Sequence, residues 1–71
     1  MALNQRLKSL RLERQVTQKR IAEAIGINTA TVQKFEYGTA KPKFETLIKL
    51  ADFFDVSLDY LACRTDNPKM A

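Results

Sequence analysis

Residues 17–38 of the chain read TQKRIAEAIGINTATVQKFEYG, and they contain the signals for two short helices joined by a tight turn. Thr17 is the predicted N-cap of a helix over 18–25, because its hydroxyl can accept a hydrogen bond from a free amide of the first turn. Gly26 directly follows that helix, at the position where helices commonly end with a residue in the left-handed conformation. Glycine adopts this conformation easily because it has no Cβ atom to clash with the backbone. The predicted buried face of this helix consists of Ile21, Ala22 and Ile25.

A second helix is predicted over 29–36, with Asn28 as its N-cap and Gly38 at its end. On a helical wheel at about 100° per residue, Val32 and Phe35 point in the same direction. They are the only large apolar residues inside this helix, so we expect them to face the core. Two helices joined by a short turn that contains glycine form a unit that sets one helix across the other.

The face of this second helix that lies opposite the core carries small residues at its start and long polar residues one turn later. Such a helix can approach another surface closely and then offer hydrogen-bond donors and acceptors. The major groove of B-DNA, about 12 Å wide, admits one α-helix. There Ala30 suits a thymine methyl, Gln33 the adenine edge and Lys34 the guanine edge. The alternative is a solvated surface, because a polar outer face is the rule for helices of globular proteins.

Three further helices are predicted from the spacing of apolar residues, and no strand pattern is present. They span about residues 3–14, 44–54 and 58–63. Ser57 caps the last of them through its hydroxyl. The predicted apolar faces are Leu3, Leu7 and Leu10 in the first helix and Phe44, Leu47, Ile48, Ala51 and Phe54 in the second.

The length and composition fit one small all-α domain. Seventy-one residues are near the lower limit at which a chain buries enough surface to fold alone. Hydrophobic residues make up 45% of the chain and charged residues 28%, with only two glycines and two prolines, which is typical of a globular helical protein. We expect a five-helix domain over residues 1–63, followed by a loose polar tail over 64–71.

Basic residues are concentrated in residues 1–43, which hold nine Lys and Arg side chains against three Glu side chains, a net charge of +6. Residues 44–71 have a net charge of −2. A chain with one basic half has an electrostatic field with a positive side, and polyanions are the obvious partners of that side. A well-solvated surface would show the same pattern of charge.

The composition argues against several classes of protein. With no His and a single Cys, the chain offers no zinc ligand set and no internal disulfide, which fits a cytoplasmic protein. The sequence predicts neither a secretion signal nor a membrane span. The only acidic cluster in the sequence consists of Asp52, Asp55 and Asp59. We interpret these residues as helix caps and solvated charges rather than as an acid–base pair or a metal site. We therefore expect neither an enzyme nor a cofactor, and we interpret Cys63 as a packing residue.

Residues 17–38, together with residues 41–61 (KPKFETLIKLADFFDVSLDYL), resemble the phage-repressor type of helix-turn-helix, the Cro/cI (XRE) family. The resemblance covers about residues 3–62, and several linked features coincide. These features are Thr17-Gln18, Ala22, Gly26, Val32, Glu36, Gly38, Pro42 and the closing sequence DVSLDYL over 55–61. The family implies a compact five-helix, lambda-repressor-like domain whose third helix reads the major groove, usually from a dimer.

The resemblance also implies site residues by position. The base-reading positions of the family correspond here to Thr29, Ala30, Gln33 and Lys34. Its phosphate-binding positions correspond to Thr17, Gln18, Tyr37, Lys41 and Lys43. The glutamine of this set, Gln18, would also brace the recognition helix. The internal ion pair of the family corresponds to Arg11 and Glu36, which we expect to meet and to be partly buried.

Two residues depart from the family pattern. Lys43 stands where Ser or Thr often caps the fourth helix, and losing a side-chain cap costs about 1 kcal/mol. Lys43 then either adds a phosphate contact or is simply solvated. Tyr37 replaces a small polar residue, and it either hydrogen-bonds a phosphate through its hydroxyl or shields the adjoining loop.

The resemblance implies a sequence-specific regulator of transcription, a repressor, that binds double-stranded DNA. The alternative is an antitoxin or another protein-interaction module that keeps the DNA-binding helices; the short tail over 64–71 favours the regulator. RNA is a weaker partner, because no aromatic stacking surface is evident beyond Tyr37. We also expect a homodimer on a palindromic operator, since one recognition helix covers only a few base pairs. The candidate dimer residues lie in the acidic half, where repulsion is least: Val56, Leu58 and Leu61.

Overall fold

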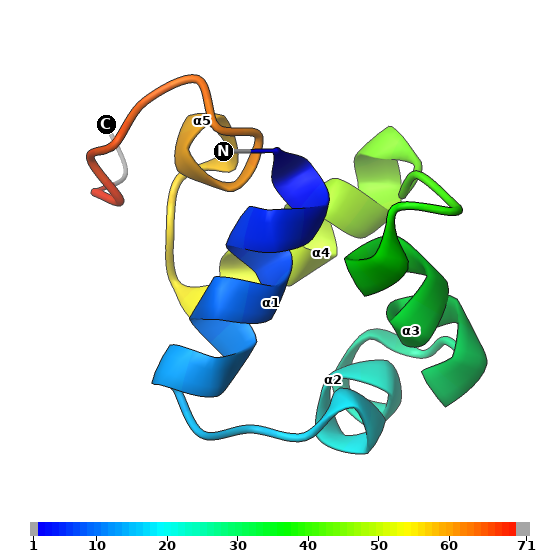
Figure 1. Ribbon diagram of the computed structural model, residues 1–71. Coiled ribbons are helices and arrows are strands. Elements are labelled where there is room, and N and C mark those ends of the chain that lie inside the picture. The colour runs from blue at the N-terminus through cyan, green and yellow to red at the C-terminus, as the bar shows by residue number, and fades with distance from the viewer. Residues whose placement is uncertain (1, 70–71) are drawn as a thin grey trace.

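The structure is a computed structural model that describes residues 2–69, in which five helices and no strand are present. The helices are α1 (Leu3–Glu13), α2 (Gln18–Ile25), α3 (Thr29–Tyr37), α4 (Phe44–Phe54) and α5 (Leu58–Leu61). The predicted five-helix fold is therefore confirmed, with helix ends within two residues of those expected. In Figure 1, α2 and α3 lie on one side of α1, and α5 lies beside the start of α1 at the opposite end.

Each helix is followed within two residues by a residue in the left-handed conformation, and this keeps the connections short. The sequence indicated two of these positions, Gly26 (φ 77°) and Gly38 (φ 84°). The other three are not glycines: Gln15 (φ 56°), Asp55 (φ 56°) and Cys63 (φ 64°). After each of these three, the next N–H donates back to the carbonyl five residues earlier, as Arg64 does to Asp59 at 2.8 Å. This bond pattern satisfies carbonyls that the helix end would otherwise leave free.

The last helix is shorter than predicted for this reason. The chain leaves α5 after Leu61, and Cys63 turns it in the left-handed conformation. Cys63 therefore serves as a helix terminator as well as a partly buried residue.

The core is formed by apolar side chains from all five helices. The buried residues are Leu7, Leu10, Ile21, Ala22, Ile25, Val32, Phe35, Leu50, Ala51, Phe54, Val56 and Leu61. The prediction for α4 was wrong in part, because Phe44 is 64% exposed and Ile48 is also exposed. Leu50 is buried instead. The buried residues of α4 lie in its last two turns, so its first turn extends beyond the elements that cover the rest.

The residues after α5 contact the domain. The Ser57 N–H donates to the Pro68 carbonyl at 2.9 Å, and Asp66 Oδ1 lies 3.3 Å from Nη2 of Arg6. The loose tail predicted over 64–71 is thus held at two points within residues 64–69; residues 70 and 71 lie outside the described part of the chain.

Arg6 is a buried charge that the sequence did not indicate. Its guanidinium carbon lies 3.9 Å from the centroid of the Tyr60 ring, and its side chain is only 8% exposed. Burial alone would lower the pKa of Arg6, but the side chains of Tyr60, Cys63 and Asp66 favour the charged form more strongly and raise it. None of the helices in residues 2–69 is long and apolar enough to cross a membrane.

Candidate nucleic-acid interface

Local signals position α2 and α3 much as expected. The Thr17 hydroxyl accepts a hydrogen bond from the Arg20 N–H at 3.0 Å, so it caps α2 as predicted. Gly26 ends that helix and donates its N–H to the Ala22 carbonyl at 2.9 Å. Asn28 occupies the N-cap position of α3, but its side chain makes no cap hydrogen bond, so this part of the prediction was wrong.

The two faces of α3 are separated as the helical wheel predicted. Val32 and Phe35 are buried in the core. The residues predicted to read bases lie on the opposite side: Ala30, Gln33 and Lys34 are exposed, and Thr29 at the first turn is half-buried. This arrangement leaves a polar surface about two turns long with small side chains at its N-terminal end.

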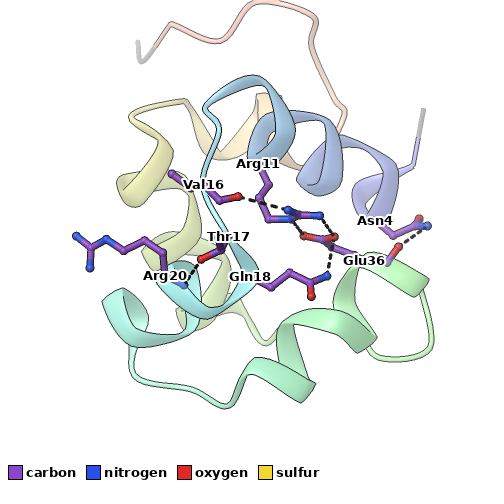
Figure 2. Close-up of polar contacts among 7 residues, drawn as sticks. All are labelled: Asn4, Arg11, Val16, Thr17, Gln18, Arg20 and Glu36. Atoms are coloured by element: carbon purple, nitrogen blue, oxygen red, sulfur yellow. Dashed lines mark hydrogen bonds and ion pairs between the residues drawn. The ribbon is translucent and has the colours of Figure 1, made fainter.

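A buried polar cluster ties α3 to the two helices before it (Figure 2). Glu36 of α3 accepts hydrogen bonds from Nε of Arg11 at 2.6 Å and from Nη2 of Arg11 at 3.1 Å. Arg11 also donates through Nη1 to the Val16 carbonyl at 3.3 Å. The predicted ion pair is confirmed, and it fixes the position of α3 against α1.

Gln18 belongs to the same cluster. Its Nε2 donates to Oε1 of Glu36 at 3.1 Å, so Gln18 braces the helix that follows it, as expected. Its Oε1 and the second amide hydrogen have no partner among the residues that the structure describes. Gln18 is half-buried, and its free polar atoms are those that could contact a phosphate.

Three of the nine basic residues in the first part of the chain are used inside the protein. Arg6 packs on Tyr60, and Arg11 pairs with Glu36. Arg14 donates through Nη1 to the Phe54 carbonyl at 2.8 Å and so satisfies the C-terminal end of α4. The other six are exposed and form no ion pair within residues 2–69: Lys8, Lys19, Arg20, Lys34, Lys41 and Lys43. These six cationic side chains are therefore available to bind an anionic partner.

The loop between α3 and α4 presents the remaining predicted phosphate ligands. Lys41 and Lys43 are exposed, and Lys43 stands at the N-cap of α4 without a side-chain cap bond. Tyr37 is 83% exposed, so its ring covers little of its own chain. This exposure argues against the alternative in which Tyr37 shields the loop, and it leaves the hydroxyl open to a ligand.

An open cleft of about 270 Å³ lies where the first three helices meet. It is lined by Lys8, Arg11, Gln18, Gln33, Glu36 and Tyr37. Of these, Lys8 was absent from the predicted site, because it precedes the helix-turn-helix in the sequence and reaches the cleft only through the packing of α1.

Two of the predicted dimer residues do not lie on the surface. Val56 and Leu61 are 1% and 0% exposed and pack in the core of the single chain. Assigning them to an interface was wrong, since the inner face of α5 and the loop before it already use them. Leu58 is partly exposed and remains the one candidate of the three. Within residues 2–69, no cluster of His, Cys, Asp or Glu side chains is placed to hold a metal ion.

The pattern of the helix-turn-helix family matches residues 7–61. The chain is 34% identical over 67 residues to an uncharacterized HTH-type transcriptional regulator, YqaE, of Bacillus subtilis (strain 168), which covers 94% of this chain and 58% of YqaE. It is 40% identical over 53 residues to the cryptic phage CTXphi transcriptional repressor RstR of Vibrio cholerae, which covers 75% of this chain and 48% of RstR. The chain thus spans about half the length of these curated relatives.

The fold is also that of a solved repressor. The structure of the P22 c2 repressor protein in complex with a synthetic operator superimposes with a TM-score of 0.82 at 21% identity, covering 86% of this chain and 92% of that one. At this level of identity the likeness establishes the shared architecture of five helices.

Proposed function

We propose that this chain, which belongs to the helix-turn-helix family, binds double-stranded DNA by placing α3 in the major groove and represses transcription. The observation that carries the proposal is the division of α3 into two faces. Val32 and Phe35 are buried, whereas Gln33 and Lys34 project from the opposite side without partners among the described residues. The amide of Gln33 matches adenine and the ammonium of Lys34 matches guanine in the major groove.

Rigidity of the reading helix supports the same role. A helix that reads bases must be held in a fixed position, because an error of about 1 Å in placement weakens a polar site. Glu36, in the last turn of α3, accepts hydrogen bonds from Arg11 and Gln18, which come from two other elements. The buried end of α3 is therefore fixed while its outer face is open.

Phosphate contacts would come from the elements on either side of α3. Thr17 and Gln18 lie at the start of α2, and Tyr37, Lys41 and Lys43 lie at the end of α3 and in the loop after it. Contacts of this kind set register and orientation without reading sequence. The proposed role places the protein in the cytoplasm with the DNA, and it requires neither an enzymatic activity nor a cofactor.

We further propose that the working form on DNA is a two-fold dimer. A single α3 covers only a few base pairs, and doubling the reading surface on a palindrome raises specificity. The two half-sites would lie about 34 Å apart, one turn of the duplex. Leu58, partly exposed at the start of α5, is the candidate contact between protomers.

Selection of binding sites from random duplex DNA by the purified chain tests the proposal. We expect enrichment of an inverted repeat. A matched control is the double variant Gln33→Ala/Lys34→Ala, which changes exposed side chains and should fold normally but lose the enrichment. Recovery of no preferred duplex by the parent chain would contradict the proposed function, and enrichment of a single half-site would contradict the dimer.

A further inference from the structure

We propose that Lys8 of α1 holds a DNA backbone phosphate in the cleft between α1 and α3, so that the DNA interface extends beyond the helix-turn-helix. This inference rests on the proposed function. Lys8 lines the cleft of about 270 Å³ together with Gln33 and Tyr37, which come from α3. The cleft therefore joins a residue of the first helix to the face proposed to read bases.

The charges in the cleft favour an anion. Its one acidic residue, Glu36, is already paired with Arg11 at 2.6 Å and bonded to Gln18 at 3.1 Å. The cationic Lys8 is exposed and has no acidic group within 4.0 Å among the described residues. After the internal pair is discounted, the lining is thus left with one positive charge.

The remaining polar groups are hydrogen-bond donors suited to phosphate oxygens. The second amide hydrogen of Gln18 and the Tyr37 hydroxyl can donate, as can the ammonium of Lys8. Tyr37 is 83% exposed, so its hydroxyl is open to a ligand. A polar cleft with one cation and several donors fits a singly charged phosphodiester better than an apolar or cationic ligand.

The position of the cleft indicates on which side of α3 the bound phosphate would lie. A helix seated in the major groove has one sugar–phosphate strand on each side of it. The loop with Lys41 and Lys43 follows the C-terminal end of α3, whereas Lys8 approaches α3 from α1. We therefore assign to Lys8 a phosphate on the α1 side of α3, which Lys41 and Lys43 do not line.

Salt-dependent binding of Lys8→Gln to duplex DNA tests the assignment, with Lys49→Gln on α4 as the matched control. Lys49 is also an exposed lysine without an ion pair in the described chain, but it lies outside the proposed interface. We expect Lys8→Gln to weaken binding to every duplex about eightfold at 0.1 M salt, and to reduce the slope of log K against log salt by about 0.9. Lys8→Arg should retain parental binding, and Lys49→Gln should behave as the parent. Parental affinity and slope in Lys8→Gln would overturn the inference.

A second measurement locates the phosphate. Neutral methylphosphonates placed one at a time along the duplex should weaken the parent at a position where Lys8→Gln is insensitive. Identical profiles for the parent and Lys8→Gln would overturn the inference, whereas a parent that binds no duplex would overturn the proposed function itself. Inorganic phosphate, added at constant ionic strength, should compete only weakly; strong competition confined to proteins with Lys8 would reassign the cleft to free phosphate.

Discussion

Arg11 of α1 and Glu36 of α3 form a two-point ion pair, with Nε 2.6 Å from Oε2 and Nη2 3.1 Å from Oε1. The Arg11 side chain is 15% exposed and that of Glu36 is 5% exposed, so both charges are largely removed from water. The pair connects the first helix to the helix proposed to read DNA. Its loss should therefore affect folding before it affects binding.

Glu36→Gln should lower the free energy of unfolding by about 3–5 kcal/mol, because it leaves the Arg11 charge buried without a counter-charge. For a domain of this size, each kcal/mol lowers the melting temperature by about 4–8 °C. Thermal unfolding followed by circular dichroism measures the loss. Glu13→Gln is the control, since Glu13 is exposed and lies 3.9 Å from Arg14, and it should melt within about 3 °C of the parent. A parental melting temperature for Glu36→Gln would show that the pair contributes little.

Gln33→Ala and Lys34→Ala should separate base reading from phosphate binding. Each should cost about 1–3 kcal/mol on the preferred duplex and relax preference at particular base pairs. Lys43→Ala should instead weaken all duplexes similarly and reduce the salt slope by about one. Titrations of matched and mismatched duplexes at several salt concentrations distinguish the two classes. Equal losses on every duplex for Gln33→Ala would remove it from the base-reading set.

Gly26→Ala should destabilise the domain by about 1–2 kcal/mol, because Gly26 has a φ of 77° and a side chain disfavours that conformation. The cost is conformational, since a Cβ at this position meets no atom within 4 Å. Gly26→Asn should cost less than Gly26→Ala, because asparagine enters the left-handed region more readily. Chemical denaturation compares the two variants, and a larger loss for Asn would point to a steric cause.

Tyr60→Leu should destabilise the domain by about 1–2 kcal/mol, because the Arg6 guanidinium packs 3.9 Å from the ring centroid in a buried position. Asp66→Asn should have a much smaller effect, since the Asp66 side chain is fully exposed to solvent although it pairs with the same arginine. Denaturation midpoints of the two variants test which contact holds Arg6. A larger effect of Asp66→Asn would mean that the chain after α5, rather than the ring, stabilises the buried charge.

Leu58→Asp should abolish cooperative binding to a palindrome if Leu58 forms the contact between protomers. Leu58 is half-buried against the core, so the change should also lower stability, and the favourable position of an acidic residue in the first turn of a helix offsets part of that cost. Leu12→Asp is the control, since Leu12 is an exposed leucine on α1 and should keep cooperative binding. Gel-shift stoichiometry on full and half sites measures the effect. A single protomer that binds the palindrome as tightly as two would contradict the dimer.

Much of the candidate site follows from local sequence. The Thr17 cap and the two glycines specify where α2 begins and where α2 and α3 end, because caps act within a few residues of themselves. The 3.6-residue period then separates Val32 and Phe35 from the exposed face of α3. The Arg11–Glu36 pair came from the resemblance to the repressor family and not from spacing, since the two residues are 25 positions apart.

The predictions of burial that failed concern where a residue lies relative to elements distant in sequence. Phe44 and Val56 are both apolar, and nothing in their local sequence distinguishes them. Phe44 is nevertheless exposed and Val56 is in the core, because burial depends on which elements cover each position. The same reason applies to Arg6, whose partner Tyr60 is brought to it only when α5 folds beside α1.

The sequence by itself determined the order of the helices, the Thr17 and Ser57 caps and the polar face of α3, because each depends on interactions within one or two turns. Only the tertiary structure decided which charged side chains are bonded inside the protein and which are left exposed to bind a ligand. Arg6, Arg11 and Arg14 are bonded internally, whereas Lys8 is carried by the packing of α1 to the edge of the reading helix. The positions of the surrounding helices thus determine which of these basic side chains stabilise the fold and which are free to bind.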